Sequence, residues 1–263
     1  MLRRMTSHEL ARIGAAFLAS FFAAAINSVA GGGTLISFPV LVALGLPSVV
    51  ANATSTIGIW PGSLGSIWGF RRELGRTDPA LRWLVVPCLV GGGAGALLLR
   101  STSPDTFDRV VPFLVLFASI LFTVRSAVQR SLRPGAGAAH RSRAWLAGAF
   151  VAAVAVGVYG GYFGAGMSIM LLAMLGIFGM TDILEMNALT SVLSFAVNAV
   201  AIAIFVAAGL VYWPFVLAMG MGALVGGYGA AGVARRIGRK AVGRFVVFVG
   251  FTVSLVFFVR KFA

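Results

Sequence analysis

The chain has 263 residues, of which 59% are hydrophobic and only 11% are charged. Soluble domains carry about 25% charged residues, so this composition excludes a soluble enzyme, and its hydrophobicity excludes intrinsic disorder. The formal net charge is +14, from 21 basic and 7 acidic residues. In a membrane protein such an excess indicates basic loops on the cytoplasmic side rather than binding of nucleic acid. We therefore expect a multi-pass protein of the cell (inner) membrane, surrounded by the lipid bilayer.

The residues that usually carry metal or catalytic chemistry are scarce. The chain has one cysteine, Cys88, and two histidines, His8 and His140, which lie in polar segments. A single thiol can form neither an internal disulfide nor a cysteine-rich metal site, and the sequence offers no nucleophile–base pair. We therefore expect no metal, no cofactor and no enzymatic activity.

Eight apolar stretches follow one another, at 12–44, 49–70, 79–99, 107–125, 144–178, 183–208, 211–233 and 241–259. A bilayer core of about 30 Å needs about 20 helical residues, so six stretches have the length of one span. The stretches 12–44 and 144–178 are longer, and each contains a glycine cluster. Because glycine costs about 1 kcal/mol relative to alanine inside a helix, we expect a break in each, with a half-helix starting at Thr34 and at Met167.

The first apolar stretch also has the pattern of a signal peptide. Arg3 and Arg4 precede an apolar run that ends in small residues at Ala30, and such runs are often cleaved. The same feature recurs in the middle of the chain, where a signal peptide has no place. We therefore expect the N-terminal stretch to be retained.

An internal repeat relates the two halves of the chain. Asn187, Pro214 and Gly226 each lie 135 residues after an equivalent residue, namely Asn52, Pro79 and Gly91, and the glycine clusters are 133 residues apart. The sequence thus predicts an all-α membrane protein of two homologous halves with four apolar stretches each, 12–125 and 144–260, joined by a basic loop at 126–143. Duplicated halves with broken helices at matching positions are typical of transporters, and duplication for structure alone is the alternative.

The relative orientation of the two halves stays open at this point. If both long stretches cross the membrane once, the halves are parallel; if each is a re-entrant hairpin, the halves are inverted. Either arrangement places 14 basic residues inside and 7 outside, so the positive-inside rule does not distinguish them. The oligomeric state is also open, with a homo-oligomer among the alternatives.

Polar side chains within the apolar stretches gather around the two expected breaks and at the start of the helix that follows each break. Asp182 and Glu185 lie at the edge of a stretch, and no buried carboxylate is evident for a cation site. Helix N-termini bind anions, so we expect the two breaks to meet near the midplane and bind one small anion. The alternative for any serine or threonine is a hydrogen bond to its own helix. The candidate substrate-binding residues are Asn27, Gly31, Gly32, Gly33, Thr34, Asn52, Thr54, Ser55, Tyr162, Gly164, Gly166, Ser168, Asn187, Thr190 and Ser191.

At these residues the chain resembles the sulfite exporter TauE/SafE family. The resemblance rests on the segment from Ala30 to Leu41, on Gly45-Leu46-Pro47 and on the segment from Ala51 to Ser55, with a weaker echo at 160–166 and 187–191. It implies a multi-span inner-membrane permease that exports sulfite or a small organosulfonate such as sulfoacetate. A passive anion channel and a non-transporting membrane scaffold or assembly factor are the competing hypotheses.

Overall fold

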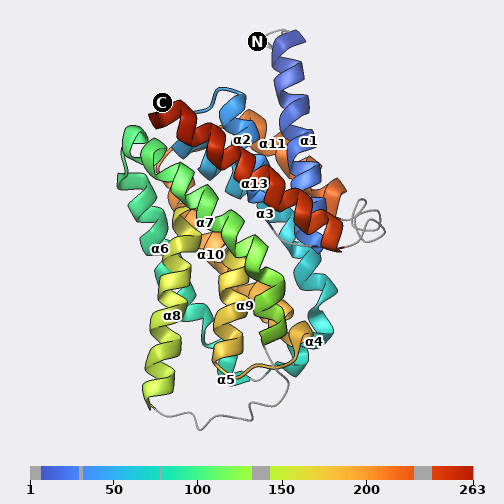
Figure 1. The fold of residues 1–263 in the computed structure, drawn as a ribbon, viewed down its shortest axis with the longest axis vertical. Coiled ribbons are helices and arrows are strands. Elements are labelled where there is room, and N and C mark those ends of the chain that lie inside the picture. Colours follow the sequence, from blue (N-terminus) through green and yellow to red (C-terminus); the bar gives the residue numbers. More distant parts are fainter. Residues whose placement is uncertain (1–6, 30–31, 78, 132–142, 228–238, 263) are drawn as a thin grey trace.

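The computed structural model describes residues 7–29, 32–77, 79–131, 143–227 and 239–262, and this part of the chain is helical, without a β-strand (Figure 1). Five helical segments are long and apolar enough to cross a membrane: Ser7–Asn27, Pro104–Arg125, Trp145–Tyr162, Ile183–Ala207 and Ala241–Phe262. Four shorter apolar helices accompany them. The expectation of an all-helical, multi-pass membrane protein is confirmed.

The helices up to residue 131 are α1 (Ser7–Val29), α2 (Thr34–Ala43), α3 (Ser48–Gly69), α4 (Arg71–Arg76), α5 (Pro79–Arg82), α6 (Val85–Ser101) and α7 (Pro104–Ser131). Those from residue 143 onward are α8 (Arg143–Tyr162), α9 (Met167–Ile177), α10 (Ile183–Ala207), α11 (Trp213–Val225) and α13 (Arg239–Phe262). Two boundaries differ from the expected ones. Pro79 begins the short helix α5 rather than the long apolar helix, so α6 starts only at Val85. The helix α7 continues six residues past 125 into the segment expected to be a loop.

Both long apolar stretches fold as helical hairpins. The Arg12 guanidinium near the start of α1 donates to the Leu44 carbonyl at the end of α2, with 2.5 Å between nitrogen and oxygen. Likewise, the Trp145 ring at the start of α8 packs on the Phe178 ring at the end of α9, with 5.4 Å between centroids. Each stretch therefore returns toward the side from which it starts.

Helices that occupy equivalent positions in the two halves pack on each other in antiparallel fashion. Near the start of α7, Asp105 pairs with Lys261 at the end of α13 at 2.6 Å. Further along α7, the Pro112 carbonyl accepts from the Ser254 hydroxyl at 3.0 Å. Since residue numbers rise along α7 as they fall along α13, these two helices run in opposite directions.

The same holds for α3 and α10. At the start of α3, the Thr54 hydroxyl accepts from the Tyr212 N–H, just beyond the end of α10. Further along, the Trp60 ring stacks on the Phe195 ring with 4.5 Å between centroids, and these two residues are 135 positions apart. The N-terminal end of α3 therefore lies beside the C-terminal end of α10.

Close approaches between helices are made at glycines. On α6, Gly91 and Gly95 lie directly against the backbone of α8, and on α11, Gly222 lies directly against the backbone of α1. Small residues let membrane helices approach each other in this way. The hairpin α8–α9 therefore packs closely on α6 through α8, and the hairpin α1–α2 packs closely on α11 through α1.

One end of the bundle is strongly basic. The helices α4 and α5 and the start of α8 lie together there, whereas the start of α1 and the end of α13 lie at the opposite end (Figure 1). Arg71, Arg72, Arg76 and Arg82 belong to this first group. We call it the basic end and the opposite one the far end.

Candidate functional site

The break between α8 and α9 presents unpaired backbone donors. Gly164 and Gly166 have φ of 78° and 82°, which glycine adopts without strain. The N–H groups of Ala165, Gly166 and Ser168 donate no hydrogen bond to any residue that the structure describes, while the Met167 N–H donates to the Gly164 carbonyl at 3.2 Å. The α9 N-terminus therefore offers three free N–H groups where the helix dipole is positive.

Asn52 of α3 lies against this break. Its side chain is buried, with 1% of its surface exposed, and its Nδ2 donates to the Tyr162 carbonyl at 3.0 Å. Its Oδ1 is buried and has no hydrogen-bond partner. Buried polar groups in native proteins almost always have a partner, so this carboxamide is the strongest indication of a ligand or a bound water at the break.

Aromatic side chains hold the α8–α9 break in place. The Tyr159 hydroxyl donates to the Ala165 carbonyl at 2.5 Å, and the Phe163 ring packs on the Phe38 ring of α2, with 5.5 Å between centroids. The Tyr162 hydroxyl reaches Thr102, at the end of α6, at 3.4 Å. The side chains that make these contacts at the break are neutral and largely aromatic.

At the break between α1 and α2, one backbone donor is paired within the protein. The Asn27 Oδ1 accepts from the Gly33 N–H at 2.7 Å, which satisfies a donor that was expected to face a ligand. Gly32 has a φ of 87° and faces the Phe122 ring of α7. Thr34 begins α2, and Gly31 lies outside the described residues.

Three hydroxyls near the starts of α2 and α3 make internal contacts. Ser55 and Ser37 are buried, and their hydroxyl oxygens are 2.7 Å apart. Thr54 accepts from the Tyr212 N–H at 3.1 Å. The sequence analysis did not single out Ser37, because its partner lies 18 residues away on the neighbouring helix.

The candidate residues of α10 lie elsewhere in the bundle. The Asn187 Nδ2 donates to the Ile183 carbonyl at 2.6 Å, and the Ser191 hydroxyl donates to the Asn187 carbonyl at 2.8 Å, so both bond their own helix. Thr190 is buried, and its hydroxyl has no partner.

Asn52 and Asn187 are not neighbours. Asn52 lies beside the C-terminal end of α10, and Asn187 lies near the N-terminal end of the same helix, about 30 Å away at 1.5 Å per residue. The expectation that both asparagines line one site with both breaks does not hold. An antiparallel pair of equivalent helices places equivalent residues on opposite sides of the crossing point.

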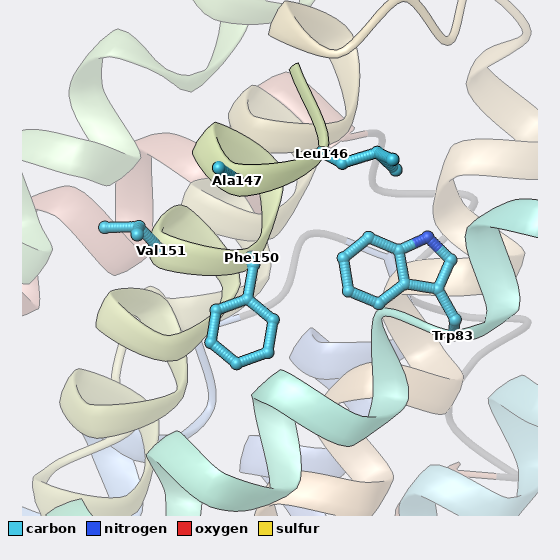
Figure 2. Close-up of a pocket in the computed structure, with 5 residues that line it drawn as sticks. All are labelled: Trp83, Leu146, Ala147, Phe150 and Val151. Carbon is cyan, nitrogen blue, oxygen red and sulfur yellow. The ribbon is translucent and has the colours of Figure 1, made fainter. Parts of the chain in front are cut away.

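A separate hollow of about 670 Å³ lies on the surface of the bundle, lined by Trp83, Leu146, Ala147, Phe150 and Val151. Figure 2 shows the Trp83 and Phe150 rings facing each other between α8 and the start of α6. Its lining is apolar, and Val151 is 66% exposed, so this hollow has the character of a lipid-facing surface. Among the described residues, no group of three acidic, histidine or cysteine side chains could hold a metal.

Apolar spanning helices, two helical hairpins broken at glycine and a buried asparagine at one break together define the class of multi-pass membrane transporters. Residues 16–257 match the family described as sulfite exporter TauE/SafE, and the chain belongs to this family. This confirms the family inferred from the sequence.

Curated relatives cover nearly the whole chain. A probable membrane transporter protein of Haemophilus influenzae is 26% identical over 241 residues, which are 90% of this chain and 91% of the relative. The probable membrane transporter protein YfcA of Escherichia coli K12 is 28% identical over 247 residues, or 92% and 88% of the two chains. A probable membrane transporter protein of Sinorhizobium, ORF9, is 26% identical over 243 residues, or 91% and 89%. No solved structure matches the chain.

Proposed function

We propose that the protein is a secondary transporter, not an enzyme, that exports a small anion, sulfite or a small organosulfonate such as sulfoacetate, across the inner membrane. The observation that carries this proposal is the α8–α9 break, where the N–H groups of Gly166 and Ser168 have no partner among the described residues and the buried Asn52 donates to the carbonyl of Tyr162, the last residue of α8. Family membership supports transport, and the donor set supports an anion as the cargo.

Neutral donors suit a substrate that must be released again. Arginine would hold an oxyanion through charge-assisted bonds about twice as strong as neutral ones, whereas the described contacts at the break are made by Asn52, Tyr159 and Phe38, which are neutral. Binding by N–H groups and an amide is strong enough to desolvate the anion but weak enough to let it leave. Such a site suits a protein that binds and releases its ligand repeatedly.

We further propose that the halves are inverted repeats. The first stretch of each half is a hairpin, so three crossings remain in each half, and the equivalent helices α7 and α13 are antiparallel. The packing between the halves is also reciprocal. The helix α6 of the first half packs on α8, the first helix of the second half, and the equivalent α11 of the second half packs on α1, the first helix of the first half. Inverted repeats of this kind allow two access states that are related by symmetry.

Cysteine accessibility tests the inverted arrangement. In a Cys88→Ala background, which removes a buried thiol, cysteines replacing Ser103 and Arg244 are expected to react with a membrane-impermeant maleimide from opposite sides. Ser103 lies just before α7, and Arg244 lies near the start of the equivalent helix α13. Labelling of both from the same side in intact cells would contradict the inversion.

Flux measurements separate transport from the competing hypotheses. Purified protein in liposomes loaded with sulfite is expected to export it against a concentration gradient when an ion gradient is imposed. A passive channel would only equalise the two concentrations. A scaffold would show neither flux nor a sulfite-dependent change in thermal stability.

A further inference from the structure

Two buried hydroxyls on α10 have no hydrogen-bond partner. They are the Oγ1 of Thr190 and the Oγ of Ser194, which lie four residues apart and therefore on one face of the helix. Continuing along this face come Val197 and Ala201, both with 0% of their surface exposed. The two hydroxyls thus point into the interior of the protein and not toward lipid.

Unpaired hydroxyls at these positions are unusual, because a serine or threonine inside a helix can bond the carbonyl four residues earlier. Ser191 on the same helix does so. In the first half, the residue equivalent to Thr190 is Ser55, which pairs with Ser37. The residue 133 positions after Ser37 is Met170, which has no hydroxyl, so the second half lacks this internal partner.

Thr190 lies on the basic-end side of the contact between Trp60 and Phe195, and Ser194 immediately precedes Phe195. That contact combines ring stacking at 4.5 Å with a hydrogen bond of 3.3 Å from the Trp60 indole N–H to the Phe195 carbonyl. Asn52 precedes Trp60 by eight residues on α3, and Thr190 precedes Phe195 by five residues on the antiparallel α10. Asn52 and Thr190 are therefore on opposite sides of the aromatic contact.

We propose that Thr190 and Ser194 form a second binding station for the transported anion, nearer the basic end than the Asn52 station. This inference rests on the proposed function. The two hydroxyls supply O–H donors, and α10 starts at the end of the bundle that carries Arg71, Arg72, Arg76 and Arg82. An exported anion would meet this station first and would pass the Trp60–Phe195 contact before it reaches Asn52.

A cation is the competing ligand for the two hydroxyls. Glu73 on α4, which also packs on α10, has one carboxylate oxygen buried without a partner. A carboxylate with two hydroxyls could hold sodium. The experiment therefore includes sodium as a separate probe.

The test compares the full-length double variant Thr190→Val/Ser194→Ala with the wild type in lipid nanodiscs. Because these hydroxyls have no partner within the protein, we expect the melting temperature without ligand to stay the same or to rise. The concentration of sulfite needed for half-maximal thermal stabilisation is expected to rise by about tenfold, since two hydrogen bonds to the ligand are lost. The matched control Ser191→Ala, whose hydroxyl bonds its own helix, should stay within about twofold of the wild type.

If the double variant depends on sulfite concentration as the wild type does, the second station is overturned. The same holds if the double variant loses a stabilisation by sodium while its stabilisation by sulfite is unchanged. If the Asn52→Ala variant still weakens sulfite binding in that case, the proposed function stands and only the second station fails. Absence of any sulfite effect in the wild type would overturn both.

Discussion

Replacing Gly95 with alanine is expected to cost about 1–3 kcal/mol of stability or more, the usual range for overpacking a close contact. A Cβ atom on Gly95 would overlap the Val158 carbonyl oxygen and come within 2.8 Å of the Tyr162 nitrogen. Both obstacles are backbone atoms of α8, which cannot rotate away. Because Tyr162 begins the break, we also expect the displaced α8 to weaken anion binding.

The matched control is Gly14→Ala in α1, where no heavy atom lies within 4 Å of the added methyl group. Alanine favours the helix more than glycine by about 1 kcal/mol, so this variant should be as stable as the wild type or slightly more stable. Thermal unfolding in detergent, followed by the loss of monodisperse protein, measures both. Equal stability of the Gly95→Ala variant and the wild type would show that α6 and α8 do not pack as described.

Asn52 carries the second large expectation. Asn52→Ala removes the donor to the Tyr162 carbonyl and the buried amide at the end of α8, so sulfite affinity should fall by about threefold to tenfold or more. Asn52→Asp keeps the shape but adds a negative charge beside the bound anion. We expect it to weaken binding further than alanine does, because like charges repel strongly where water is excluded.

Thr56→Val is the control for these variants. The Thr56 hydroxyl donates to the Asn52 carbonyl of its own helix at 3.0 Å, so its loss alters α3 one turn from the site without removing a ligand donor. Sulfite-dependent thermal stabilisation of the three purified variants provides the comparison. A folded Asn52→Asp variant with wild-type affinity would remove Asn52 from the binding site.

The sequence predicted the elements of the fold better than their arrangement. Glycine clusters in stretches too long for one span predicted half-helices at Thr34 and Met167, and α2 and α9 begin at these residues. These features depend on local backbone preferences, which a sequence displays directly. The hairpins depend on distant contacts such as Arg12 with Leu44, and the charge count was the same for both orientations of the halves.

The same division applies to the candidate site. The repeat singled out Asn52, and the structure places it against the second break. The repeat also suggested that Asn187 plays an equal part. Equivalent residues of two antiparallel helices come together only at the point where the helices cross, as Trp60 and Phe195 do. Asn27 accepts from the Gly33 N–H six residues later, and the sequence does not display this contact because a helix cap usually comes from the residue just before the helix.

Sulfite efflux from liposomes is the most direct test of the account that an anion is carried through the Asn52 site. Wild-type protein should export sulfite faster than protein-free liposomes and against its gradient when an ion gradient is imposed, and Asn52→Asp, reconstituted in equal amount and shown to be folded, should reduce this rate at least about tenfold. A wild-type rate no greater than that of protein-free liposomes would contradict the transport of sulfite. An unchanged rate in the folded Asn52→Asp variant would contradict the site.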